Sequence, residues 1–186
     1  MIYPTLSLQT VGLVVGVLLL LAHLGALFFA PVCQRLLRRF PRSGEAGAVL
    51  LTVATVWAVS LLATMDLGEF SSYRQIFMGV VIAGYVLTLV FVREFLAVRA
   101  LGMLLLLAAE PLIEAAFLRP ETSRLLLTVL AYIWATVGMF WVGKPYLLRD
   151  QIEWLGRSVW RWRVAALGGA LYGAVLTIAA VTLYHG

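Results

Sequence analysis

Two glutamates and a proline stand in an otherwise apolar stretch, "LLLLAAEPLIEAAFLRP", at residues 104–120. Glu110 and Glu114 are four residues apart, so on a helix they share one face. Pro111 cannot donate a hydrogen bond to the carbonyl of Leu107, and it predicts a kink there. A freed carbonyl oxygen beside two carboxyl groups forms an oxygen-rich patch. Such a patch has the chemistry to bind a cation, relay protons or hold a polar head group.

The same two carboxyl groups also have a structural interpretation. Inside a helical bundle, Glu110 would donate a hydrogen bond to a neighbouring helix, and the candidate acceptors are Tyr132, Thr136 and Ser60. Glu114 lies closer to the outer end of its helix and would face outer water. A functional site and a structural polar contact therefore both remain open at this position.

His23 is a second isolated polar side chain, in "LLLLAHLGALFF". A haem bound by two histidines is not expected, because the only other histidine, His185, lies at a different depth. A metal site of His23 with the two glutamates is a minor alternative to a hydrogen-bonded packing histidine. The sequence contains no HExxH, CxxC, P-loop or nucleophile-elbow motif. We therefore predict no catalytic residue, no metal and no cofactor. The sequence leaves open whether the protein is an enzyme, and the absence of these motifs favours one that is not.

The composition predicts the elements that carry these residues. Of the 186 residues, 63% are hydrophobic and 12% are charged, whereas soluble domains are roughly half apolar and about a quarter charged. Apolar runs near the membrane-spanning length recur along the whole chain. They predict an all-α integral membrane protein, a six-transmembrane-helix bundle that forms one domain over residues 1–186. The predicted spans are 8–30, 46–65, 75–92, 99–118, 124–143 and 164–184.

The basic residues predict the orientation of these spans. Eleven of the fourteen lysines and arginines fall in three connections on one side, namely Arg35, Arg38, Arg39, Arg42, Arg93, Arg99, Lys144, Arg149, Arg157, Arg161 and Arg163. Only Arg74, Arg119 and Arg124 fall on the other side. The positive-inside rule places the basic connections in the cytoplasm and both termini outside. The arginine-rich, lysine-poor composition favours a prokaryotic inner membrane, and the basic loops favour anionic lipid over nucleic acid as a partner.

Of the connections between the spans, only that from Lys144 to Arg163 is predicted to form a clear structure of its own. Its apolar residues fall on one helical face, which predicts a cytoplasmic interfacial amphipathic helix over residues 145–162. Arg149–Glu153 and Glu153–Arg157 are spaced to pair along it. The helix either orients the last two spans or contacts lipid or a partner. The predicted contact residues are Arg149, Glu153, Trp154, Arg157, Trp160 and Arg161.

Two GxxxG motifs mark expected helix contacts. Gly12 and Gly16 lie in the first span, and Gly169 and Gly173 lie in the last. Glycines let two helix backbones approach closely, so these faces serve packing within the chain or assembly with other subunits or a second copy.

Three function classes follow from these patterns. The first is a non-catalytic subunit or scaffold of a larger membrane complex. The second is a small proton, cation or solute transporter or channel that uses Glu110 and Glu114. The third is a lipid-modifying membrane enzyme that acts at the cytoplasmic face.

Overall fold

The computed structural model describes residues 7–92 and 94–184, and the helices in these ranges account for nearly all of the chain. The α-helices are α1 (Leu8–Phe28), α2 (Ala30–Arg39), α3 (Gly44–Thr64), α4 (Arg74–Phe91), α5 (Leu96–Ala116), α6 (Arg124–Gly143), α7 (Tyr146–Gly156) and α8 (Val159–Thr182). Two 3₁₀ helices, η1 (Phe40–Arg42) and η2 (Gly68–Tyr73), join them, and the described ranges hold no strand.

Six of these helices are long and apolar enough to cross a membrane. They are α1, α3, α4 together with η2, α5, α6 and α8. The predicted all-helical class with six such segments is therefore confirmed, and the bounds agree within a few residues. Arg93 and His185, which were predicted to lie on the cytoplasmic and outer sides, lie outside the described residues.

Local sequence signals begin several of the helices. Ser7 caps α1 by accepting a hydrogen bond from the backbone N–H of Thr10 at 3.0 Å, and Ser43 does the same for Ala46 in α3 at 3.2 Å. Such caps satisfy backbone donors that a helix leaves free at its start. Pro31 stands in the first turn of α2, where a missing N–H is tolerated.

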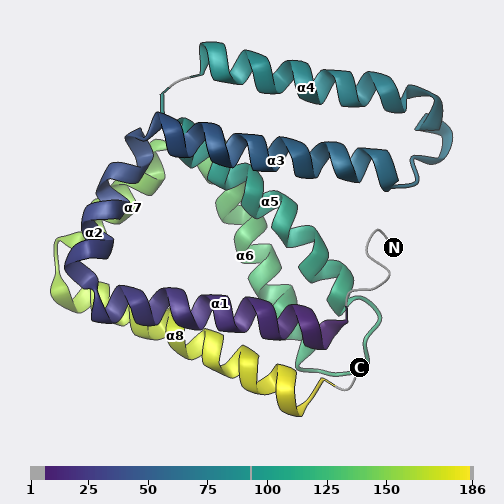
Figure 1. The fold of residues 1–186 in the computed structure, drawn as a ribbon. Helices are drawn as coiled ribbons and strands as arrows, with labels where there is room; N and C mark the ends of the chain where they lie inside the picture. Colours follow the sequence, from purple (N-terminus) through teal and green to yellow (C-terminus); the bar gives the residue numbers. More distant parts are fainter. Residues whose placement is uncertain (1–6, 93, 185–186) are drawn as a thin grey trace.

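The helices lie in three neighbouring pairs, α1 with α8, α5 with α6, and α3 with α4 (Figure 1). The short helices α2 and α7 lie against each other across one end of these pairs. We call this end the loop side, because it holds the connections that carry most of the basic residues. The opposite end, where α1 begins and α8 ends, is the terminal side.

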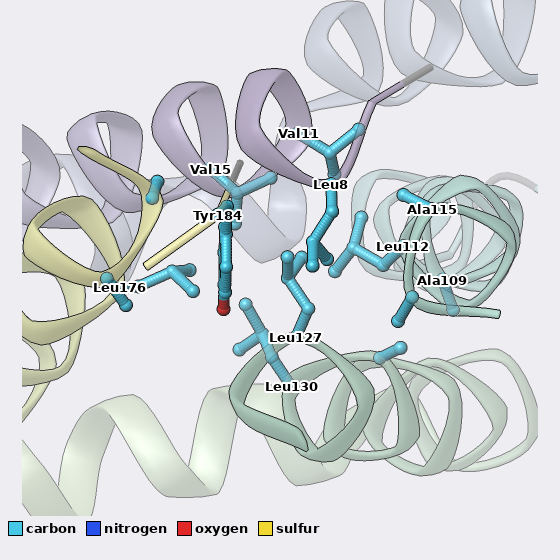
Figure 2. Packing of buried hydrophobic residues seen from close by; sticks show 14 residues of the cluster. Leu8, Val11, Val15, Ala109, Leu112, Ala115, Leu127, Leu130, Leu176 and Tyr184 are labelled. Carbon is cyan, nitrogen blue, oxygen red and sulfur yellow. The ribbon is translucent and has the colours of Figure 1, made fainter. Parts of the chain in front are cut away.

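The largest buried cluster joins α1, α5, α6 and α8 near the terminal side (Figure 2). Its members are Leu8, Val11, Val15, Ala109, Leu112, Ala115, Ala116, Leu127, Leu130, Ala131, Leu176, Ala179, Ala180 and Tyr184. The Tyr184 hydroxyl donates to the carbonyl of Ser123 at 2.8 Å, and the Tyr172 hydroxyl donates to that of Leu126 at 2.6 Å. These two bonds fix the end of α8 against the start of α6.

The α3–α4 hairpin is attached to the rest of the molecule at one end. The buried residues of α3, Gly47, Leu51 and Ala54, all lie in its first half, and Leu51 packs with Leu96 and Ala100 of α5. No residue of α4 is buried. Figure 1 shows α3 and α5 close together at the loop side and diverging toward the terminal side.

Two connections differ from the prediction. The expected interfacial helix over 145–162 is divided, because α7 ends at Gly156 and α8 begins at Val159. The break falls at Ser158, whose backbone is extended. The region predicted as an unstructured basic loop after the first span forms α2 and η1 instead. The expectation that only residues 144–163 form a structured connection is therefore wrong.

Candidate functional site

Glu110 and Glu114 lie in a pocket of about 470 Å³ on the side of the α5–α6 pair. Both glutamates come from α5, which also contributes most of the apolar lining, and α6 contributes Ala135. Ala109 also faces the buried cluster, whereas Phe117 is exposed. The pocket is therefore a largely apolar hollow that carries a pair of carboxyl groups.

The carboxyl groups of Glu110 and Glu114 lie close enough to interact. A hydrogen bond between them would need a proton on one of them, because an ionised carboxylate is only an acceptor. The Oε2 atom of Glu110 is shielded from solvent and has no hydrogen-bond partner within the described residues. An acceptor buried in this way costs about 1–3 kcal/mol when its hydrogen bond is not made.

Within the described residues, Glu110 forms no hydrogen bond with any of the three candidate acceptors. Ser60 donates to the carbonyl of Trp57 at 2.7 Å, and Tyr132 of α6 is 62% exposed. Thr136, like the other two, lines no part of the pocket. The Glu110 carboxyl group therefore lines the pocket without a hydrogen bond to another helix within the described residues.

Pro111 lies inside α5, and the helix continues through it to Ala116. The proline ring has no N–H, so the carbonyl of Leu107 lacks its usual helical donor. The grouping of this carbonyl with the two carboxyl groups in one oxygen-rich patch stays a prediction.

His23 does not join this group. It lies in the part of α1 near the loop side, whereas Glu110 lies in the half of α5 near the terminal side. Its Nδ1 donates to the carbonyl of Leu19 at 2.8 Å, and its ring lies against Gly169 of α8. The described residues contain no group of three or more side chains able to hold a metal. The minor alternative of a metal site has no geometric support.

The four glycines of the GxxxG motifs lie between α1 and α8. A Cβ atom on Gly16 would lie 2.5 Å from Oγ1 of Thr177, and one on Gly173 would lie 2.6 Å from the backbone nitrogen of Leu20. Gly12 faces the ring of Tyr184, and Gly169 faces His23. Within the chain, these glycines therefore serve the pairing of its first and last long helices. A second use in assembly stays a prediction.

The predicted contact residues of the basic connection lie at the loop side. Arg149 pairs with Asp150 at 2.8 Å, because its guanidinium reaches the adjacent carboxylate through two donors, Nε and Nη2. Neither predicted pair of Glu153, with Arg149 or with Arg157, forms among the described residues.

Two tryptophans of this connection are exposed. Trp154 is 53% exposed and Trp160 is 73% exposed, and the guanidinium of Arg161 stacks 4.6 Å from the Trp154 ring centre. Exposed tryptophans beside arginines are typical of the water interface of a membrane.

A second pocket, of about 390 Å³, lies between α2, η1 and α7. Its walls include Arg38 and Arg42, which were not predicted to belong to a site, together with Arg149, Glu153 and Arg157. The spacing of the arginines in "QRLLRRFPR" was a signal that this segment presents a basic face, but the sequence does not indicate what lies opposite.

No family model, no curated protein and no solved structure matches this chain. The chemistry of the two polar pockets described above therefore carries the functional argument.

Proposed function

We propose that this chain is a non-catalytic, multi-pass subunit of a larger membrane complex. Its six long apolar helices are compatible with insertion in a prokaryotic inner membrane. The excess of basic residues on the loop side supports a cytoplasmic location for that side, with both termini outside.

The carboxyl pair in the lateral pocket carries this proposal. In a bilayer the pocket would open toward acyl chains, which offer no hydrogen-bond donor. A charged side chain at the centre of a spanning helix costs about 2.5–3.5 kcal/mol on insertion scales. A transmembrane segment of a partner that presents a donor or a cation would interact with the carboxyl pair that lines this pocket.

The arrangement of the α3–α4 hairpin supports the same partner. Helices in lipid associate through close packing and interhelical hydrogen bonds, yet α4 has no buried residue and α3 packs on α5 only through its first half. The hairpin diverges from α5 on the terminal side (Figure 1), in the half of α5 that carries the carboxyl groups. A partner helix placed there would pack against α5 and α6 and contact the hairpin.

A second candidate function is a proton or cation transporter, and one observation favours it. Glu110 and Glu114 line one pocket on the helix in which Pro111 leaves a carbonyl without its usual donor. This arrangement is suited to passing a proton between oxygens. The lipid-modifying enzyme stays a prediction from the sequence, with no feature of the geometry that favours it.

The subunit proposal is tested by gentle solubilisation of native membranes and mass analysis of the recovered complex. The wild-type chain should be recovered together with a membrane protein partner in a fixed stoichiometric ratio. The double variant Glu110→Leu, Glu114→Leu should stay folded, because leucine suits an apolar surface, but it should lose the partner. Ile113→Leu, an apolar exchange in the same pocket, is the matched control and should retain it.

Two results would count against the subunit proposal. One is a wild-type chain that is recovered as a single copy. The other is a double variant that keeps its partner in full. A single copy that carries protons or cations in liposomes, with flux lost in Glu110→Gln, would support the transporter instead.

A further inference from the structure

The second pocket, between α2, η1 and α7, has a marked excess of positive charge. Four arginines line it, Arg38, Arg42, Arg149 and Arg157, and the lining contains a single carboxylate, Glu153. They come from two stretches that are far apart in the sequence, α2 with η1 and α7 with the residue after it, and that are brought together at the loop side. Converging guanidinium groups are a common arrangement for holding a phosphate, because each offers several donors in one plane.

Most of this charge is not neutralised within the molecule. Arg149 is paired with the exposed Asp150. No hydrogen bond or ion pair joins Arg38, Arg42 or Arg157 to another residue in the part of the chain that the structure describes. Arginines held near one another without counter-charges repel, so an anion that enters the pocket gains attraction from each of them.

The pocket also has an apolar component and a suitable size. Pro41 and Ile152 line it and are both buried. Its volume of about 390 Å³ falls within the range of pockets that take small ligands, about 300–1,000 Å³. A ligand with a phosphate next to an apolar portion would match both parts of this lining.

The surroundings of the pocket identify the source of such a ligand. The pocket lies at the ends of the long apolar helices, on the side where Trp154 and Trp160 are exposed. We propose that it is a binding site for the phosphate group of an anionic phospholipid. This inference shares with the subunit proposal only the insertion of the chain in a membrane, and it uses none of the residues of the carboxyl pocket.

The test uses the full chain, purified in a neutral detergent and examined by native mass spectrometry while short-chain phosphatidylglycerol or phosphatidylcholine is added. One phosphatidylglycerol molecule should bind per chain in preference to phosphatidylcholine. Arg38→Gln with Arg42→Gln should weaken this binding by about tenfold or more, since hydrogen bonds to charged groups are lost.

Arg35→Gln with Arg39→Gln is the matched control. It removes the same charge from the same stretch of chain, in α2, but neither residue lines the pocket, so binding should stay close to that of the wild type. An equal loss in the two double variants would overturn the site, because general surface charge would then account for the binding.

A second variant tests the geometry without changing charge. A Cβ atom on Gly156 would lie 2.9 Å from Nη2 of Arg38, so Gly156→Ala should displace this flexible guanidinium group, leave the fold intact and weaken lipid binding. Unchanged binding in Gly156→Ala and in Arg157→Gln, from the opposite wall, would contradict the proposal. Inorganic phosphate that displaces the lipid at similar concentrations would show a site for a soluble anion and overturn the assignment to a lipid.

Discussion

At the residue scale, the contact between His23 and Gly169 explains why a histidine is tolerated in the first long helix. The Nδ1–H of His23 donates to the Leu19 carbonyl of its own helix. The ring then occupies the space that the missing side chain of Gly169 leaves on α8. The histidine and the glycine therefore form one packing unit between the paired helices.

We predict that Gly169→Ala destabilises the fold, because its Cβ would lie 2.1 Å from atoms of the His23 ring. Overpacking of this kind costs about 1–3 kcal/mol, measurable as a lower unfolding midpoint in detergent. His23→Ala in the same chain should restore most of the loss. The matched control is Gly168→Ala, where nothing lies within 4 Å of the added Cβ. Equal effects at the two glycines would show that the contact does not matter.

The GxxxG spacing predicted that helices approach closely at Gly12, Gly16, Gly169 and Gly173, but it did not indicate which helices. Small residues give no directional signal, so packing within the chain and packing between chains look the same in the sequence. The structure also holds a close pair without a GxxxG motif, Gly102 of α5 and Gly138 of α6. Each would place a Cβ atom within 2.8 Å of the other's carbonyl oxygen.

At the element scale, the attachment of the α3–α4 hairpin depends on a short region of α3. Gly47 allows α3 to approach the start of α5, and Leu51 continues the contact through a small buried cluster. Beyond Ala54 the helix has no further buried residue. This single region therefore controls the position of the whole hairpin.

We predict that Gly47→Val loosens the hairpin, because the first added carbon would lie 2.7 Å from the backbone nitrogen of Ala97. Hydrogen–deuterium exchange in nanodiscs should then rise over residues 47–54 and 96–100, while the α1–α8 pair stays protected. Gly79→Val in α4, with no atom near the added Cβ, is the control. Protection that stays unchanged in Gly47→Val would disprove the single attachment.

The long helices were predictable, whereas the short ones were only partly so. Runs of about twenty apolar residues have few alternatives to a spanning helix. The ten residues of α2 contain no such run, and their arginines were interpreted as markers of orientation and of contact with anionic lipid, not as part of a helix. The break between α7 and α8 had local signals in Gly156 and Ser158, types that favour helix ends and helix starts respectively.

At the scale of the whole molecule, the α1–α8 and α5–α6 pairs meet near the terminal side, and the α3–α4 hairpin joins α5 at the loop side. The carboxyl pocket is left on a lateral surface. The sequence correctly predicted that Glu110 and Glu114 share a face of one helix. It could not predict which way that face points, because helices that are apolar all round have no polar stripe to mark the outside. The arginine pocket was missed for a related reason, since it forms only where α2 and α7 are brought together.

The most direct test of the subunit proposal is site-specific photo-crosslinking in native membranes from position 113, inside the carboxyl pocket. A photoreactive residue in place of Ile113 should link to a second membrane polypeptide, and the link should disappear when Glu110 and Glu114 are both leucine. The same probe at Leu171, which is exposed on α8 outside the pocket, is the control for random collisions. Links from position 113 to lipid alone would contradict a partner helix at this site.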